Sequence, residues 1–502
     1  MPNASPFSRN APAKCDLLLR GACVVDGTGQ PGATGDIAIT GDRIVAIGDL
    51  HDVAAERVMA AGGLVAAPGF IDVHTHDDRA LLSNPAMAAK TSQGVTTVVT
   101  GNCGISLAPL VPMREMPMTF DLLGGPEWFR YDDFDSYLAD CSSKPAAVNA
   151  IALVGHSTLR FGTMPTLDRA ANQQEIGAMQ ERLAQAMAAG ALGFSSGLYY
   201  PTSRAAPTEE VVALAKVAGA HGGLYATHMR DEGDGVEDSV EETLLIGREG
   251  GLPVLISHHK MIGPQNFGRS VQTLARIERA MQEQRVALDV YPYVAGSTVL
   301  DPKRCDGRMR VMVTWSRSHP EMAGQDIDAI AKTWNCHPVE AAERLLPAGA
   351  IYFMLDEDDV RRILAFPHTM IGSDGLPHDQ HPHPRLWGAF PRVLGRYARE
   401  LGLLTLEEAI RRMTSLPAAY LGLEDRGVLR SGAYADIVLL DPMQVIDRAT
   451  FEHPVQPADG IAMVMVNGHV VWQNGAPTSE RPGRTLRRAN RLNAVPTSAA
   501  AS

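Results

Sequence analysis

The feature that most restricts the fold of this 502-residue chain is a series of eight short apolar runs, each ending in a polar or glycine-rich cluster. In chain order the runs are LVAAPGFIDVHTH, VTTVVTGNCG, NAIALVGH, ALGFSSGL, LYATHMR, PVLISHHK, ALDVYPY and HTMIGSDG. Most are followed by a pattern of period 3.6, as in residues 270–286, which is typical of an amphipathic helix. Eight strands alternating with helices over about 310 residues predict an α/β fold, a (β/α)8 TIM barrel with catalytic side chains at the carboxyl ends of its strands.

Two β-rich segments lie at opposite ends of the chain, at residues 15–66 and 421–485. Both alternate apolar and polar residues around hairpin signals, of which Asn467-Gly468 is the stronger. We expect the two segments to pair into one small β-domain beside a catalytic barrel of residues 67–420.

Spacing and polarity predict three further segments. Successive runs lie about 30 to 50 residues apart, except for a gap of about 80 residues before the eighth run. An inserted segment at about 298–350, before the eighth strand, would account for that gap. The polar ends of the chain, residues 1–14 and 486–502, are expected to be flexible tails.

Composition narrows the class of partner. With 45% apolar and 20% charged residues the chain has ample material for a core, and a net charge of −12 argues against nucleic acid or an anionic membrane as the partner. No run of eighteen apolar residues occurs, and the first residues show no signal-peptide pattern. The six scattered cysteines do not suggest a disulfide framework and favour a reducing, cytoplasmic location. We expect a small-molecule substrate.

Five of the apolar runs end in residue types that bind metals. These are His74 and His76 in the first run, Cys103 in the second, His228 in the fifth, His258 in the sixth and Asp374 in the eighth. Residues i and i+2 of a strand share a face, so the two imidazoles of the first run can reach one ion. A mixture of nitrogen, sulfur and oxygen donors favours zinc over magnesium or calcium.

Each of these residues has an ordinary structural interpretation when taken alone. A histidine at a strand end is often a core residue, a buried cysteine is usually a small apolar side chain, and an aspartate before glycine is usually a turn residue. Their common position decides between the interpretations, because six candidate ligands at the ends of five predicted barrel strands are not expected by chance. The sequence therefore predicts a metal site.

Several motifs together resemble the N-acyl-D-amino-acid deacylases, or D-aminoacylases, of the amidohydrolase superfamily. The motifs are GFIDVHTHDD, GNCGIS, GFSSGLYYP, THMRDE, SHHK, DVYPYVAGST and IGSDGLPHD, and the similarity runs in order from about residue 15 to residue 485. The resemblance implies a barrel, a small β-domain from both chain ends and an inserted segment by the active site. It also implies zinc-dependent hydrolysis of N-acyl-D-amino acids to a carboxylate and a free D-amino acid.

The resemblance assigns roles to the candidate ligands. Cys103, His228 and His258 would hold one tightly bound zinc ion, and His74 and His76 would belong to a second, weaker site with Cys103 and Asp374 shared or adjacent. Superfamily members often use a carboxylated lysine from the fourth strand, but the run ALGFSSGL has no lysine, and Cys103 takes the place of that ligand. Asp374 would take a proton from the attacking water and pass it to the leaving amine.

Four residues are candidates for substrate binding. Lys260 follows His258 by two residues, so both would project to one side if the strand continues, and Lys260 could bind the substrate α-carboxylate. Tyr291 and Ser297 resemble the family's other carboxylate-binding positions. Arg304, in the inserted segment, could meet an acidic side chain or assist with the α-carboxylate.

Simpler interpretations remain for these side chains, which could be solvated charges or packing residues. The stretch HPHPRLWGAFPR at 381–392 is expected to be an active-site loop, although its prolines and tryptophan could equally pack on the barrel rim.

Two alternatives for the whole chain also stay open. One is another amidohydrolase, isoaspartyl dipeptidase-like or dihydroorotase-like, and the other is a catalytically dead barrel that serves as an assembly subunit.

Overall fold

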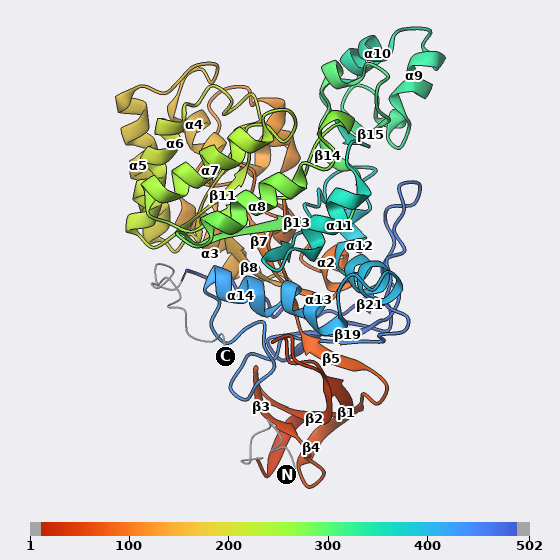
Figure 1. Ribbon diagram of the computed structural model, residues 1–502. Coiled ribbons are helices and arrows are strands. Elements are labelled where there is room, and N and C mark those ends of the chain that lie inside the picture. The colour runs from red at the N-terminus through yellow and green to blue at the C-terminus, as the bar shows by residue number, and fades with distance from the viewer. Residues whose placement is uncertain (1–11, 489–502) are drawn as a thin grey trace.

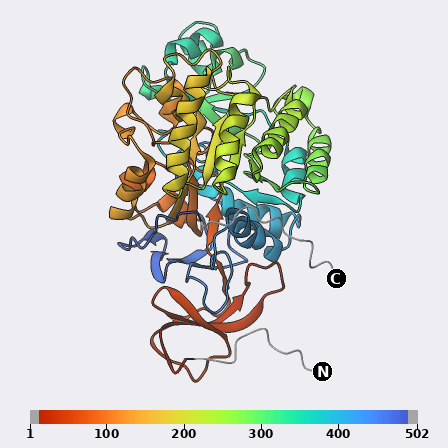
Figure 2. The same ribbon diagram turned by 90° about the vertical axis from the view of Figure 1, so that its left-hand side faces the viewer.

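A computed structural model describes residues 12–488 and contains a barrel of parallel strands (Figure 1, Figure 2). In order around the barrel these are β6 (Phe70–Asp72), β7 (Val95–Thr100), β8 (Asn149–Ala152) continued by β9 (Val154–Gly155), β10 (Gly193–Gly197), β11 (Leu224–His228), β12 (Val254–Ile256), β13 (Val286–Val290) and β17 (Thr369–Ile371). Neighbours pair in parallel, and a parallel bridge between Thr75 and Gly375 joins the chain after the first strand to the chain after the last. The predicted (β/α)8 barrel is confirmed.

Apolar side chains fill the inside of the barrel below its carboxyl end. They include Val99, Leu153, Leu224, Leu255 and Met370, all buried in one cluster contributed by many strands. The barrel is therefore a packed core, and the polar side chains of the candidate site lie above this layer, where the strands end.

Helices surround the barrel (Figure 1). They are α1 (Ala80–Ser83), α2 (Ala88–Thr91), α3 (Phe134–Ser143), α4 (His156–Thr163), α5 (Gln173–Ala188), α6 (Thr208–Ala220), α7 (Val236–Gly250), α8 (Ser270–Ala280), α11 (Glu357–Ala365), α12 (Arg385–Arg392), the π-helix at Val393–Glu400, α13 (Leu406–Met413) and α14 (Ser415–Leu421). Local sequence sets several of their ends. Helix α5 begins with a capping box between Asn172 and Glu175, and α7 ends at Gly251, which adopts φ 63°.

Strands from both ends of the chain form a separate nine-stranded sheet, at the bottom of Figure 1. Its members are β1 (Lys14–Val24), β2 (Ala33–Thr40), β3 (Arg43–Gly48), β4 (Ala54–Ala60), β5 (Val65–Pro68), β18 (Ile437–Leu440), β19 (Ile461–Val466), β20 (His469–Gln473) and β21 (Ala476–Pro477). The antiparallel pair β5–β18 joins the two halves. Asn467 and Gly468 adopt positive φ values in the hairpin between β19 and β20, as this dipeptide predicts.

The chain between β13 and β17 contains an antiparallel three-stranded sheet, at the upper right of Figure 1. It is built from β14 (Gly296–Val299), β15 (Val311–Ser316) and β16 (Ala348–Tyr352), with α9 (Ile327–Thr333) and α10 (Pro338–Leu345) packed on it around a core of their own. This segment brings β14 and the turn Pro302–Arg304 to the carboxyl end of the barrel.

The two ends of the described chain are both tied to their surroundings. Strand β1 starts at Lys14, inside the segment expected to be a tail, and the Leu486 N–H donates to the Ala150 carbonyl at 2.7 Å. The remainder of the expected tails, residues 1–11 and 489–502, lies outside the described residues. Within residues 12–488, no helix is long and apolar enough to cross a membrane.

Candidate metal centre and active-site pocket

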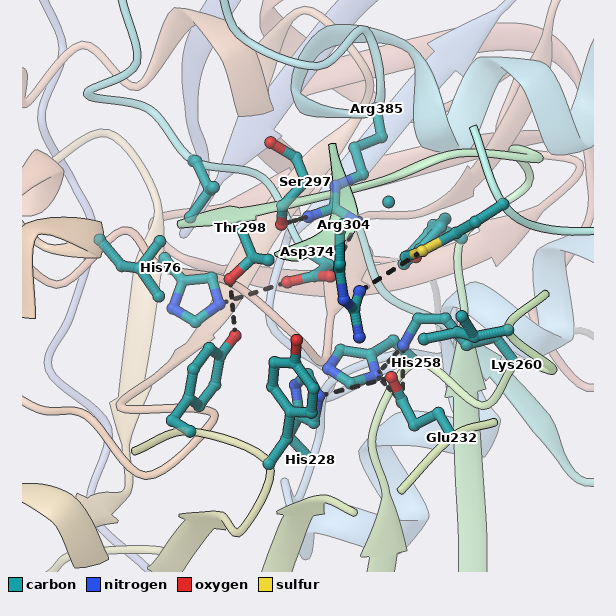
Figure 3. A pocket seen from close by; sticks show the side chains of 18 residues that line it. His76, His228, Glu232, His258, Lys260, Ser297, Thr298, Arg304, Asp374 and Arg385 are labelled. Carbon is teal, nitrogen blue, oxygen red and sulfur yellow. Dashed lines mark hydrogen bonds and ion pairs between the residues drawn. The ribbon is translucent and has the colours of Figure 1, made fainter. Parts of the chain in front are cut away.

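A pocket opens where the barrel strands end, between the barrel and the inserted segment (Figure 3). Most of the side chains singled out in the sequence line it: His76, His228, His258, Lys260, Tyr291, Ser297, Arg304 and Asp374. His74 and Cys103 lie fully buried beside this group, in contact with the pocket-lining histidines. The fold therefore brings all ten predicted site residues to one place.

The sulfur of Cys103 is the centre of the cluster. It lies 3.5 Å from His258 Nε2, 3.8 Å from His228 Nδ1 and 3.3 Å from His74 Nε2. Two ligands of one tetrahedral zinc ion, at about 2.0 to 2.3 Å from the metal, lie roughly 3.5 Å from each other. The distances from the Cys103 sulfur to His228 and to His258 are both close to this value.

Three of the clustered residues adopt left-handed backbone conformations. Cys103 has φ 54°, His258 has φ 37° and Asp374 has φ 48°, a region that costs a residue with a side chain about 1–3 kcal/mol. Hydrogen bonds hold two of these turns, because the His258 N–H donates to Asp289 Oδ1 at 2.9 Å and the Asp374 N–H donates to the His74 carbonyl at 2.8 Å. The fold thus forces side chains from separate strand ends to converge.

Glu232, which sequence reasoning missed, orients both histidines that face Cys103. Its Oε2 lies 3.4 Å from His228 Nε2 and its Oε1 lies 3.1 Å from His258 Nδ1. These are the ring nitrogens on the far side from the sulfur, so N–H donation to Glu232 leaves His228 Nδ1 and His258 Nε2 free to bind a metal. Its position four residues after His228, in THMRDE, was the available signal.

His74 and His76 approach the same cluster from the first strand. His74 Nε2 lies 3.5 Å and His76 Nε2 lies 3.2 Å from Asp374 Oδ1, while His74 Nδ1 lies 3.4 Å from Asp289 Oδ2. One atom from each of His74, Cys103, His258 and Asp374 lies within 4.8 Å of the others, which is one group with metal-binding spacing, and His228, Glu232 and His258 form the other. Strand β6 itself ends at Asp72, before both histidines.

Burial and neighbouring charge shift the titration of these groups. Burial raises the pKa of the Cys103 thiol, but the positive charge of His74 and His258 outweighs it and holds the pKa well below its ordinary value. Burial likewise opposes ionisation of Asp374, yet Arg385 and His74 hold its pKa well below the usual range. The cluster therefore presents a thiolate and a carboxylate, the two forms that bind a cation.

Arg385 is a second pocket residue that sequence reasoning missed. Its NH1 lies 2.8 Å from Asp374 Oδ2, its NH2 donates to the Ser297 carbonyl at 3.1 Å, and its guanidinium lies 4.4 Å from the centre of the Tyr291 ring. The Tyr291 hydroxyl and the Ser297 Oγ are buried with no hydrogen-bond partner among the described residues. Two unpaired donors beside a guanidinium are suited to an anionic group.

The structure corrects two local expectations about this region. Within the segment 381–392 only residues 381–384 form a loop, because helix α12 begins at Arg385 and places its first residue in the pocket. Strand β12 ends at Ile256 and does not continue through His258, so Lys260 reaches the site through a turn. Lys260 Nζ lies 2.7 Å from Glu232 Oε1 and 2.6 Å from His258 Nδ1. If Nε2 binds a metal, the proton is on Nδ1, and the ammonium then bonds Glu232 rather than the ring.

Arg304 reaches the pocket from the inserted segment. Its guanidinium lies 5.0 Å from the centre of the Tyr199 ring and 5.5 Å from that of Tyr352, and its NH1 lies 3.7 Å from Met354 Sδ. Within the described part of the chain no carboxylate forms an ion pair with it, whereas Lys260 and Arg385 each have one. Arg304 is therefore a pocket cation free to meet an anion (Figure 3).

Comparisons with known proteins identify the family of this chain. The model of the amidohydrolase family matches residues 57–472. The chain is 54% identical to a D-aminoacylase of Alcaligenes xylosoxydans xylosoxydans over 94% of this chain and 98% of that one, and 49% identical to an N-acyl-D-glutamate deacylase of the same organism over 95% and 97%.

A solved structure shares the whole architecture. The N-acyl-D-glutamate deacylase of Bordetella bronchiseptica, complexed with zinc and a phosphonate that mimics the tetrahedral intermediate, superposes with a TM-score of 0.92 at 47% identity, covering 94% of this chain and all of that chain. The resemblance inferred from the motifs is confirmed. The chain belongs to the amidohydrolase family and, within it, to the metal-dependent N-acyl-D-amino-acid deacylases.

Proposed function

We propose that this protein hydrolyses the amide bond of N-acyl-D-amino acids with one zinc ion held by Cys103, His228 and His258. The observation that carries the proposal is the spacing of the two imidazole nitrogens from the Cys103 sulfur, 3.5 Å and 3.8 Å, directly beside Asp374. The products are a carboxylate and a free D-amino acid. The names of the full-length relatives, a D-aminoacylase and an N-acyl-D-glutamate deacylase, support this substrate class.

The donor set fits zinc. One thiolate and two imidazoles, which are neutral once they bind the metal, are ligands that zinc accepts and that magnesium and calcium do not prefer. Glu232 fixes both rings as ligand-orienting carboxylates do. When bound, zinc lowers the pKa of a water and polarises the amide carbonyl. His74 and His76, with Cys103 and Asp374, would hold a second ion more weakly, since they contribute no additional thiolate.

Asp374 moves the proton in this scheme. Its ion pair with Arg385 and its contact with His76 favour the carboxylate, so it begins the reaction as a base. It accepts the proton of the attacking water at Oδ1 or Oδ2 and then donates it to the nitrogen of the leaving amine. Both events require a side chain beside the metal cluster, which is where Asp374 lies.

The substrate α-carboxylate would bind to Lys260, Tyr291 and Ser297, joined by Arg385. The free hydroxyls of Tyr291 and Ser297 supply neutral donors, and the two cations supply charge. Lys260 already pairs with Glu232, and Arg385 already pairs with Asp374. Each cation would therefore contact a protein carboxylate and the substrate carboxylate at the same time.

Arg304 supports a preference for acidic side chains. It faces the pocket without a carboxylate partner in the described chain, between two tyrosine rings that position its guanidinium. An N-acyl-D-glutamate or N-acyl-D-aspartate would supply the missing anion. The alternative, a broad enzyme for apolar D-residues, is favoured by Leu122 and Met354, which also line the pocket.

We also propose that the protein acts in the cytoplasm on small molecules. Its net charge of −12 and its six free cysteines support this assignment. The two rival readings of the chain have less support, because the fourth barrel strand carries no lysine for a dihydroorotase-like site and because the ligands and Asp374 are all present.

Two variants test the metal and the base. Cys103→Ala should lose both tightly bound zinc and turnover of N-acetyl-D-glutamate, because the thiolate is the strongest ligand. Asp374→Asn should keep zinc at the site of Cys103, His228 and His258 but lower kcat by about 10² to 10⁴-fold. Full turnover in zinc-free Cys103→Ala, or more than a tenth of wild-type kcat in Asp374→Asn, would contradict the scheme.

A panel of N-acetyl D- and L-amino acids tests the substrate. Arg304→Leu should reduce kcat/KM for N-acetyl-D-glutamate by roughly 10 to 150-fold, the loss of one charge-assisted contact, and should leave N-acetyl-D-leucine within about threefold. Arg308→Leu is the matched control, since Arg308 lies in the same segment, is 84% exposed and pairs with Asp306. Equal losses for both substrates would remove the specificity role of Arg304 but not the deacylase activity.

A further inference from the structure

The loop that carries Cys103 is bent by three residues with positive φ values. Gly101 has φ 74°, Cys103 has φ 54° and Gly104 has φ 79°. The loop follows strand β7 and contacts both the neighbouring strand β9 and strand β10, the fourth strand of the barrel. Its geometry determines where the Cys103 sulfur lies relative to the two histidines.

Two glycines on neighbouring strands make room for this loop. A Cβ atom on Gly155 of β9 would lie 2.4 Å from the Gly104 carbonyl oxygen, and a Cβ atom on Gly197 of β10 would lie 2.3 Å from the Cys103 carbonyl oxygen. Both distances are far below van der Waals contact. The Cys103 loop therefore occupies the space that side chains of the third and fourth strands would otherwise fill.

The hydroxyl of Ser195, on β10, makes two hydrogen bonds to the backbone of this loop. Its Oγ accepts a hydrogen bond from the Gly104 N–H at 2.9 Å and donates one to the Gly101 carbonyl. These two backbone groups bracket Asn102 and Cys103. A serine hydroxyl has one donor and two acceptor sites, so it can satisfy both groups at once, and Ser195 is fully buried where water cannot replace it.

We propose that Ser195 is a positioning residue for the metal centre: its hydroxyl sets the Cys103 thiolate at the distance from His228 and His258 that one zinc ion requires. The fourth strand then contributes no ligand of its own, and it acts through the loop that it clamps. This inference rests on the proposed zinc site and adds to it a residue that touches neither metal nor substrate.

The neighbouring Ser196 provides a matched control. It is also fully buried on the same strand, but its Oγ bonds the Tyr225 hydroxyl at 2.6 Å and Thr227 Oγ1 at 2.8 Å, away from the Cys103 loop. Ser195→Ala and Ser196→Ala remove the same atom from the same strand. A general loss of stability would affect both variants, whereas a displaced thiolate would affect only the first.

The experiment measures the zinc dissociation constant by chelator competition, and the sulfur-to-metal charge-transfer band of the cobalt(II)-substituted proteins. Ser195→Ala should weaken zinc binding by about 10 to 100-fold and reduce the band, as loss of a residue that orients a ligand does. Ser196→Ala should match wild type in both. Equal zinc affinity and equal bands in Ser195→Ala and wild type, or equal weakening in both variants, would overturn the proposal.

Two further variants separate a failure of this proposal from a failure to fold and from a wrong ligand set. If Ser195→Ala is not obtained folded, Ser195→Thr retains the hydroxyl and should bind zinc within about threefold of wild type, and a folded Ser195→Thr that loses zinc would overturn the proposal. Cys103→Ala should lack the charge-transfer band altogether. A band that persists in Cys103→Ala would instead contradict the proposed ligand set, so the two failures can be told apart.

Discussion

Two buried lysine–carboxylate groups support the site from opposite sides of the barrel. At the junction of the first and last strands, Lys90 Nζ lies 2.8 Å from Asp72 Oδ2, 3.2 Å from Asp77 Oδ2 and 2.7 Å from Ser373 Oγ. Across the barrel, Lys260 Nζ lies 2.7 Å from Glu232 Oε1. The residue types are the same, but Lys90 is sealed in the protein whereas Lys260 lines the pocket.

The difference lies in what each carboxylate holds. Asp72 Oδ1 accepts hydrogen bonds from the backbone N–H groups of His74, at 3.3 Å, and Ser373, at 2.8 Å, so it ties together the two strand ends that close the barrel. Glu232 instead contacts two imidazole rings and leaves its lysine facing the substrate space (Figure 3). The Lys90 group is suited to stabilise the closed barrel, and the Lys260 group is suited to orient metal ligands and bind substrate.

The largest expected effect is a loss of folding stability when Lys90, rather than Lys260, is replaced. Lys90→Met leaves Asp72 and Asp77 buried without their cation and should reduce the free energy of unfolding by about 3–5 kcal/mol. Urea unfolding of the zinc-saturated protein measures it, with the exposed Lys216→Met as control. A loss below about 1 kcal/mol in Lys90→Met would show that the Lys90 group does not hold the barrel closed.

The second effect concerns substrate binding at the other lysine. Lys260→Met should raise KM for every N-acyl-D-amino acid by roughly 10 to 150-fold while kcat changes less, because the α-carboxylate contact is made in both ground and transition states. Its unfolding free energy should fall less than that of Lys90→Met, since Glu232 keeps its two imidazole partners. An unchanged KM would reduce Lys260 to a structural role.

The smallest expected effect is a difference in zinc affinity between variants of the two carboxylates, Glu232 and Asp72. Glu232→Gln should weaken zinc binding by about 10 to 100-fold, because an amide cannot accept from both imidazole rings and the lysine. Asp72→Asn should lower stability but leave affinity at the tight site unchanged, since Asp72 touches none of Cys103, His228 and His258. Chelator competition on both variants measures this difference. An equal loss of zinc affinity in the two variants would contradict it.

Most of the architecture was predictable because its signals are local. A strand of the barrel is an apolar run followed by a polar or glycine cluster, and the residues at that boundary come to the carboxyl end of the barrel whatever the rest of the chain does. The hairpin at Asn467-Gly468 and the helix stop at Gly251 likewise follow from backbone preferences of single residues. Helix α12 escaped prediction because the prolines of HPHPR favour a loop, yet Pro384 precedes its first turn, where proline is tolerated.

The partners of the site residues were decided by the tertiary structure. The sequence by itself determined the barrel, the β-rich ends and a set of metal-binding residue types at strand ends, because each depends on near neighbours in the chain. It did not determine that Lys90 meets Ser373, 283 residues away, that Arg385 pairs with Asp374, or that Ser195 brackets the Cys103 loop. Hydrogen bonds and ion pairs act over a few ångströms in space, so only the closed barrel brings these groups together and decides which lysine faces the pocket.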